Sequence, residues 1–146
     1  MSTFHVYLNL PGTTDSAFEF YSELFGAQYR DRYTYRDMAA HGVDTQPKHA
    51  DLIAHAALEL PNMLLMSSDS EEPVQQTKGN SVIFLHYAPD SIQDADRVFE
   101  ALASGGEVIM PIDHQPWGYN GRCIDRFGVA WEVLFDTELE PDADAN

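Results

Sequence analysis

The chain has 146 residues, of which 44% are hydrophobic and 12% aromatic, so it can form one globular domain or two fused half-size modules. Its 24 acidic and 8 basic residues give a formal net charge of −16, which argues against binding to nucleic acids or anionic membranes. A single cysteine, Cys123, excludes an internal disulfide. There is no signal-peptide pattern and no apolar run of the roughly 18 residues that a membrane span needs, so we expect a cytoplasmic protein.

In the first half of the chain, the sequence predicts one helix and four strands. Thr14, Asp15 and Ser16 are candidate helix caps, and Ser16 has the capping-box spacing to Glu19. Apolar residues then recur at helical spacing up to Gly26, which is expected to end the helix. Residues 36–51 show no clear period and are predicted to be a loop. The expected strands are residues 4–10, 28–35, 52–60 and 63–67.

The second half repeats this order after a polar linker. We expect a strand at 81–87, a helix that Ser91 opens, a strand at 107–110 ended by Pro111, and a loop at 113–119. A hairpin then turns at Phe127–Gly128. The sequence F-Y-S-E-L-F-G at 20–26 matches F-E-A-L-A-S-G at 99–105. The predicted parts are a first module at 1–70, a linker at 71–79, a second module at 80–136 and an acidic tail at 137–146.

Glu132 is unusual because its carboxylate lies within the apolar strand V-A-W-E-V-L-F. A buried carboxylate without a partner is costly, so Glu132 either meets water or pairs with a metal, an arginine or a ligand. Strand alternation puts Trp131, Val133 and Phe135 on one face, where we expect the helix to pack. Glu132 is then on the opposite face.

Three segments carry a resemblance to a known family. The motifs F-E-F-Y-S-E-L-F-G, I-A-H-A-A-L-E-L with L-L-M-S-S-D, and P-W-G-Y-N-G-R-C-I-D-R-F-G-V-A-W-E resemble the PhnB-like branch of the vicinal oxygen chelate superfamily. That superfamily includes glyoxalase I, bleomycin-resistance proteins and extradiol dioxygenases. The resemblance implies an α+β fold of two βαβββ modules, which form a curved, cup-shaped mixed sheet with helices on its outer face. It also implies a homodimer.

The resemblance further implies a divalent metal, such as zinc, iron, manganese or nickel, with one ligand on each of four strands. His5 and Glu132 fall at two of these positions. The other two positions fall near Leu65 or Met66 and near Ser81 or Val82, which are poor ligands, so the site is incomplete relative to metal-dependent members. His55 or His86 would complete it if either side chain points into the cup.

Each of these residues also has an ordinary structural interpretation. His5 can be a strand histidine bonded to backbone, Glu132 can pair with Arg122 or Arg126, and His55 can make a hydrogen bond across the sheet. Aromatic and apolar residues that could line a ligand pocket, or else be core or dimer contacts, are Trp117, Tyr119, Tyr7 and Met66. Cys123 has no obvious pair of basic neighbours and no triad partners in the sequence, which argues against a nucleophilic role.

Two functions remain open at this point. In the first, a metal held by His5, Glu132 and His55 acts as a Lewis acid on a small molecule, and Glu132 is the catalytic proton shuttle. In the second, a metal-free protein sequesters a flat or cationic small molecule, which the net charge of −16 would attract. No glycine-rich turn of a nucleotide-binding site is present.

Overall fold

The computed structural model describes residues 2–42, 46–71 and 81–136. The chain divides into two compact units, Met1–Gln75 and Gln76–Asn146. Apart from residue 71, the predicted linker lies outside the described residues, as does the predicted tail. No helix in the described ranges is both long and apolar enough to cross a membrane.

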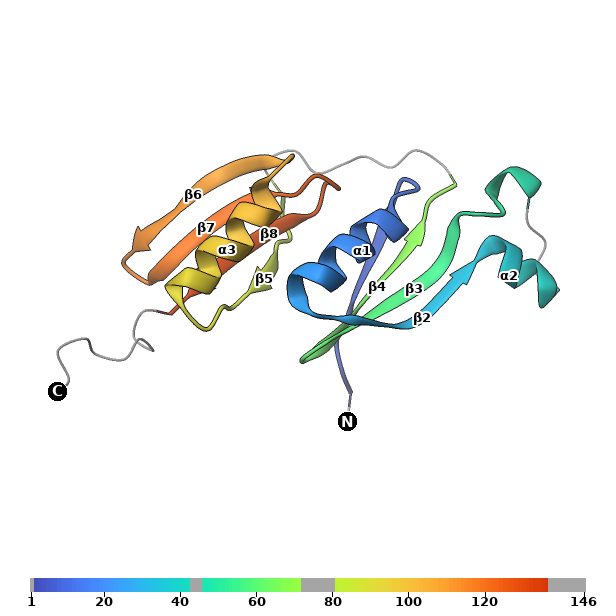
Figure 1. Ribbon diagram of the computed structural model, residues 1–146, viewed down its shortest axis with the longest axis horizontal. Helices are drawn as coiled ribbons and strands as arrows, with labels where there is room; N and C mark the ends of the chain where they lie inside the picture. Colours follow the sequence, from blue (N-terminus) through green and yellow to red (C-terminus); the bar gives the residue numbers. More distant parts are fainter. Residues whose placement is uncertain (1, 43–45, 72–80, 137–146) are drawn as a thin grey trace. The chain divides into compact units, whose positions relative to one another are not determined.

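The first unit is a four-stranded mixed sheet in the order β1-β4-β3-β2 (Figure 1). β1 runs parallel to β4, and the other neighbours are antiparallel. The strands are β1 (Val6–Leu10), β2 (Gln28–Thr34), β3 (Ile53–Leu60) and β4 (Met63–Asp69). This is the βαβββ order that the sequence predicted.

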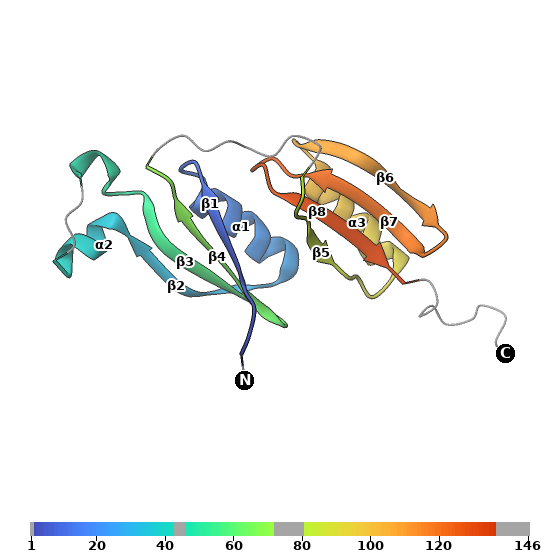
Figure 2. The same cartoon turned by 180° about the vertical axis from the view of Figure 1, so that it is seen from behind.

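Helix α1 (Thr14–Phe25) covers one face of this sheet. Ala17, Phe18 and Tyr21 form its buried stripe, and all three are fully buried. Gly26 ends the helix in the left-handed conformation, as predicted. Seen from behind, the opposite face of the sheet carries no helix from the described residues of this unit (Figure 2).

The start of α1 corrects the sequence prediction, because the N-cap is Thr13 and its side chain makes no capping hydrogen bond. The acceptor comes instead from the end of β4. Asp69 Oδ1 accepts a 2.9 Å hydrogen bond from the backbone N–H of Thr14, and its Oδ2 accepts one of 2.8 Å from the N–H of Ile53. A buried carboxylate thus caps the helix and fixes the start of β3 at the same time.

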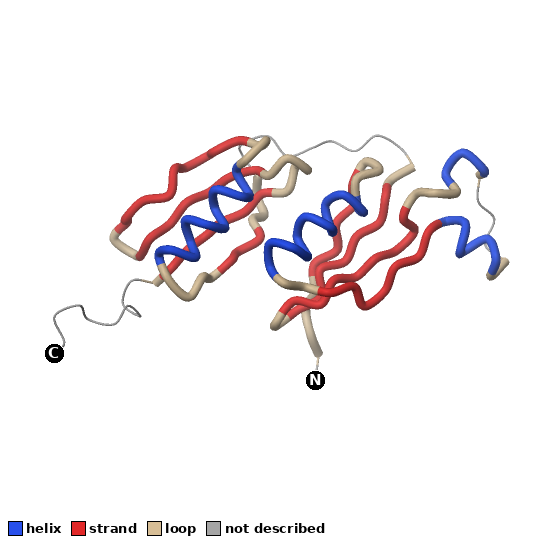
Figure 3. The backbone as a smooth tube through the Cα atoms, in the orientation of Figure 1, coloured by secondary structure: helices blue, strands red, loops and turns tan. Residues whose placement is uncertain are grey.

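Residues 36–51 are not the irregular loop that the sequence predicted. They contain most of helix α2 (Tyr35–Ala40) and the short 3-10 helix η1 (Pro47–His49), both visible in Figure 3. Thr34 and Asp37 form a capping box at the start of α2, because each side chain bonds the other residue's backbone N–H. These two hydrogen bonds stabilise the start of α2, although its sequence has no apolar helical period.

The second unit repeats the first with the sheet order β5-β8-β7-β6, and β5 runs parallel to β8. Helix α3 (Ile92–Ala103) packs on one face through Ala95, Val98, Phe99 and Leu102. Ser91 caps it as predicted, by accepting a hydrogen bond from the N–H of Asp94. The strands are β5 (Leu85–Tyr87), β6 (Glu107–Gln115), β7 (Gly118–Ile124) and β8 (Ala130–Phe135).

Two strands and one loop of the second unit differ from the prediction. β5 is shorter than 81–87, and β6 continues through Pro111, so the predicted loop at 113–119 is mostly a hairpin. Proline is tolerated because β6 is an edge strand with register shifts on either side of Met110. Gly118 follows the turn at φ 146°, where a side chain would also meet the carbonyl oxygen of Phe135.

Both units therefore have the predicted α+β architecture of two βαβββ modules, each with a mixed sheet and a main helix on one face. In each unit, no helix within the described residues covers the opposite face, the open face of that sheet.

Candidate functional site

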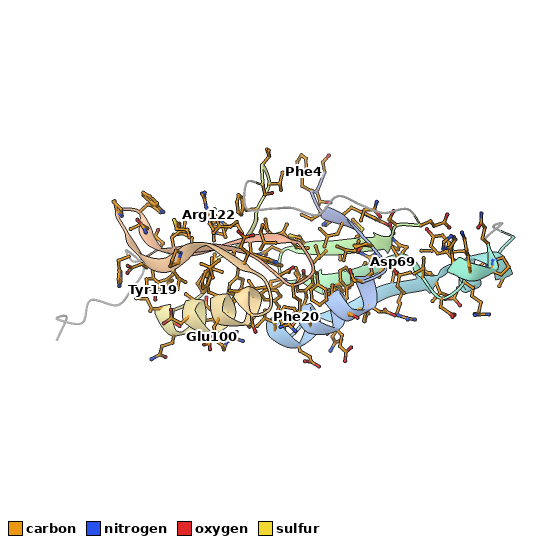
Figure 4. All side chains as sticks on the ribbon, turned by 90° about the horizontal axis from the view of Figure 1, so that it is seen from above. Phe4, Phe20, Asp69, Glu100, Tyr119 and Arg122 are labelled. Atoms are coloured by element: carbon orange, nitrogen blue, oxygen red, sulfur yellow. The ribbon has the colours of Figure 1, made fainter. Side chains whose placement is uncertain are left out.

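Glu132 lies on the face of the second sheet that α3 does not cover. Its Cα partner in the parallel strand β5 is His86, and its partner in β7 is Arg122, so the three residues form one row across the sheet. Figure 4 shows Arg122 on the side of the sheet opposite α3. The alternation predicted from V-A-W-E-V-L-F is confirmed, because Trp131 and Val133 are buried on the α3 face.

The Glu132 carboxylate has two polar neighbours. Its Oε1 accepts a 3.0 Å hydrogen bond from Asn120 Nδ2, and its Oε2 lies 3.8 Å from Arg122 Nη2. The second distance is an ion-pair distance but too long for a hydrogen bond. The Glu132 side chain is 19% exposed. One oxygen is therefore fixed by the protein, while the other keeps hydrogen-bonding capacity.

Asn120 was missed by the sequence reasoning, although it lies on the same face of β7 as Arg122. It is 1% exposed, and each of its polar groups has a partner. Besides Glu132, its Nδ2 donates to the carbonyl oxygen of Val133 at 3.0 Å, and its Oδ1 accepts from Trp117 Nε1 at 3.4 Å. A polar residue two positions before Arg122 in an alternating strand was the available signal.

Trp117 lies in the turn between β6 and β7 and is 59% exposed. Its indole N–H is tied to Asn120, so the ring is oriented by the same amide that holds Glu132. Large exposed aromatic rings with one fixed polar edge are common ligand contacts. This residue was among the predicted pocket residues.

Arg122 is held by contacts other than its pairing with Glu132. Its guanidinium lies over the ring of Phe84, 5.1 Å from the centroid. Its Nε is buried and has no hydrogen-bond partner among the residues that the structure describes. The guanidinium is therefore restrained beside the carboxylate without forming the bidentate pair that would neutralise Glu132 most strongly.

The open face of the first sheet carries three other predicted residues. Tyr7 in β1 is the Cα partner of Met66 in β4, and Met66 is in turn the partner of Ala57 in β3. His55 is two residues before Ala57 on the same face. Its Nδ1 lies 3.2 Å from Tyr7 Oη, and the two rings are stacked with centroids 5.8 Å apart. Met66 thus has the row position in this sheet that Glu132 has in the other.

His5 lies just before β1 and is exposed. Its Nδ1 accepts a 2.9 Å hydrogen bond from the N–H of Leu64, and its Nε2 is 3.1 Å from Thr3 Oγ1. In a neutral imidazole with Nδ1 as acceptor, the proton is on Nε2. Neither nitrogen then offers a free lone pair to a metal. The bond to Leu64 extends the β1–β4 pairing.

Tyr119 and Cys123 lie on the α3 side of the second sheet, as Figure 4 shows for Tyr119. Tyr119 Oη donates a 2.6 Å hydrogen bond to Asp96 of α3, which raises the pKa of the phenol to about 12. Burial raises the pKa of the Cys123 thiol to about 12. Since the thiol stays protonated at neutral pH, it is a poor nucleophile. Neither residue shares the face of Glu132.

The metal that the resemblance implies would need several His, Cys, Asp or Glu side chains close together. Among residues 2–42, 46–71 and 81–136, no three His, Cys, Asp or Glu side chains are grouped closely enough to hold an ion. Catalytic zinc usually has three protein ligands. In the second sheet the candidates are His86 and Glu132, and the adjacent Arg122 guanidinium repels a further cation. Within each unit, these residues do not fit a bound metal.

Comparison with known sequences decides the family. The model of the Glyoxalase/Bleomycin resistance protein/Dioxygenase superfamily matches residues 6–133. The chain belongs to this superfamily. Protein PA1353 from Pseudomonas aeruginosa is 31% identical, with a TM-score of 0.78, and the match covers 93% of this chain and 98% of that one. The search of curated proteins gave no significant match.

Two further structures share the fold. A putative 3-demethylubiquinone-9 3-methyltransferase, PhnB protein, from Bacillus cereus is 23% identical with a TM-score of 0.77, over 92% of this chain and 99% of that one. The fosfomycin resistance protein FosX from Listeria monocytogenes is 12% identical with a TM-score of 0.64, over 93% and 94% of the two chains. At these identities the likeness establishes architecture alone. A PhnB protein among the neighbours agrees with the resemblance noted in the sequence.

Proposed function

We propose that this protein binds a small, flat molecule bearing N–H donors on the open face of its second sheet, without a metal. Glu132 is the acceptor for those donors, and the exposed indole of Trp117 stacks on the ligand. The observation that supports this most is the half-buried carboxylate, which Asn120 fixes at one oxygen and leaves available at the other. The description of the matching superfamily includes bleomycin resistance proteins, which agrees with a role in binding small molecules.

The preferred ligand class is a planar cation. A carboxylate that accepts from a charged donor forms a stronger hydrogen bond than one that accepts from a neutral donor. A cation over the Trp117 face gains further attraction from the ring electrons. The net charge of −16 raises the rate at which cations arrive. Arg122 opposes a cation placed directly beside it, which favours binding on the Trp117 side of the carboxylate.

Three probes of one shape and different charge test this proposal. Benzamidine is cationic, benzamide is neutral and benzoate is anionic. We expect thermal stabilisation in the order benzamidine, benzamide, benzoate, because a ligand that binds only the folded state raises the melting temperature. Isothermal titration calorimetry should show that Glu132→Gln weakens benzamidine binding about tenfold and benzamide binding much less.

Glu59→Gln is the matched control, since Glu59 is an exposed strand carboxylate in the first unit. It should leave all three probes unaffected. Benzoate stabilisation equal to that of benzamidine would contradict the proposal. So would a preference for benzamidine that survives in Glu132→Gln.

A second candidate is a divalent-metal-dependent enzyme, with Glu132 as catalytic group. It is favoured by His86, a ligand-type residue that faces Glu132 across parallel strands. A mutant FosX was crystallised with Mn(II) and 1S,2S-dihydroxypropylphosphonic acid, so a relative in fold does hold a metal.

Metal uptake separates the two candidates. Protein dialysed against Mn(II) and then against metal-free buffer should, under our main proposal, retain no more metal than Glu132→Gln. Elemental analysis and calorimetry measure this directly. One equivalent of Mn(II), lost in both Glu132→Gln and His86→Asn, would establish the metal candidate and overturn the metal-free one.

A further inference from the structure

The amide of Asn120 joins the two groups to which the proposed function gives ligand contacts. Nδ2 donates to Glu132 Oε1 at 3.0 Å, and Oδ1 accepts from Trp117 Nε1 at 3.4 Å. The carboxylate on β8 and the indole in the β6–β7 turn are therefore connected through one side chain on β7. No other residue in the described part of the chain bonds to both side chains.

The orientation of this amide is fixed by its neighbours. Both the Glu132 carboxylate and the Val133 carbonyl can only accept, so Nδ2 must face them. The indole N–H can only donate, so Oδ1 must face Trp117. With 1% exposure, Asn120 cannot exchange these partners for water. If the amide were flipped, Oδ1 would face the acceptors on Glu132 and Val133, and Nδ2 would face the donor Trp117 Nε1, so these hydrogen bonds would be lost.

We infer that Asn120 is a positioning residue that holds the Glu132 carboxylate and the Trp117 indole in one fixed arrangement for ligand recognition. It touches no ligand itself. A change at Glu132 must then reach Trp117 through the amide, even in the free protein. The binding consequence rests on the proposed function, whereas the coupling between Glu132 and Trp117 does not.

The coupling is measurable by NMR on protein labelled with 15N-tryptophan. Two indole N–H signals are expected, from Trp117 and Trp131, and Trp117→Phe assigns them. Glu132→Gln should shift the Trp117 signal and leave that of Trp131 in place, because Trp131 donates to Asp125 instead. In an Asn120→Leu background, the same Glu132→Gln change should no longer move the Trp117 signal.

Asn120→Ala is the second variant, in case leucine at this buried site prevents folding. It removes both the acceptor for Trp117 Nε1 and the donor to Glu132 without adding bulk. In this variant too, the Trp117 signal should be insensitive to Glu132→Gln. A purely structural role predicts instead that both indole signals change together. Asn9→Leu, at an exposed position on β1, is the control and should change neither.

The binding arm uses benzamidine as the probe. Asn120→Leu should weaken its binding about tenfold, and the loss should be much smaller when Glu132 is already glutamine. The inference would be overturned if Glu132→Gln left the Trp117 signal unchanged in the wild-type background. It would also be overturned if Glu132→Gln shifted that signal equally in the wild-type and Asn120→Leu backgrounds. If the coupling is present but benzamidine binds no variant, the proposed function fails while the positioning role stands.

Discussion

Asp69 shows how much a single buried carboxylate does in the first unit. It is 4% exposed and accepts from the backbone N–H of Thr14 and of Ile53. The hydroxyls of Thr14 and Ser67 pair at 2.8 Å beside it. Backbone donors inside a protein have no water to replace a lost acceptor. The start of α1 and the start of β3 therefore depend on the same side chain.

Replacing Asp69 with alanine should lower the free energy of unfolding by about 2–5 kcal/mol, because two buried N–H groups lose their acceptor. Asp69→Asn keeps one acceptor oxygen and should lose about half as much. Urea unfolding followed by far-UV circular dichroism measures both. Asp51→Ala is the control, since Asp51 pairs with Arg36 at the surface and should matter little. Equal stability of Asp69→Ala and Asp51→Ala would contradict this role.

Single residues were predictable from the sequence only where strand alternation determined them. The face of Glu132 followed from its bulky neighbours, and burial confirms it. The sequence also suggested a backbone partner for His5 and a sheet hydrogen bond for His55 as ordinary alternatives, and the geometry contains both contacts. Alternation was a signal for the face on which Asn120 lies, but its bonds to Trp117 and Glu132 could not be predicted. They depend on the β7–β8 register and on a turn that the sequence placed in a loop.

At the scale of helices and strands, features set by residues close together in sequence were predicted correctly. Features set by residues far apart in sequence were not. Ser91 caps α3 as predicted, because the hydroxyl and its target are three residues apart. The cap of α1 was placed wrongly, because its acceptor Asp69 is 55 residues away in sequence. β6 was ended too early at Pro111, since an edge strand needs only one side of its backbone hydrogen bonds. These errors changed boundaries and left the order of elements intact.

The two sheets also differ in the side chains at equivalent positions, which the sequence repeat did not indicate. In each sheet, one pair of residues lies side by side on the two parallel strands. The pair is Tyr7 and Met66 in the first sheet, and His86 and Glu132 in the second. The repeat predicted equivalent modules, and it correctly gave their architecture. It did not predict that polar chemistry on the open face of the second unit would centre on Asn120 and Arg122. Side-chain identity at equivalent positions has diverged while the backbone pattern has persisted.

For the whole molecule, the charge of −16 means that acidic groups repel one another in the folded state. Salt shortens the range of this repulsion, from about 10 Å at 0.1 M to about 3 Å at 1 M. We therefore expect the melting temperature to rise as sodium chloride is added over that range, with the same rise in potassium chloride. Differential scanning calorimetry measures it. A melting temperature that falls with salt would show that attractive ion pairs outweigh the repulsion.

Both tryptophans belong to one module, since Trp117 and Trp131 lie in the unit Gln76–Asn146 and the unit Met1–Gln75 contains none. Fluorescence excited where tyrosine does not absorb therefore originates entirely from the second module. Within it, the solvent-facing indole of Trp117 and the enclosed one of Trp131 emit from contrasting surroundings. Circular dichroism reports the backbone of both halves. Comparing the two signals during denaturation reveals, without any attached dye, whether the halves melt together or in turn.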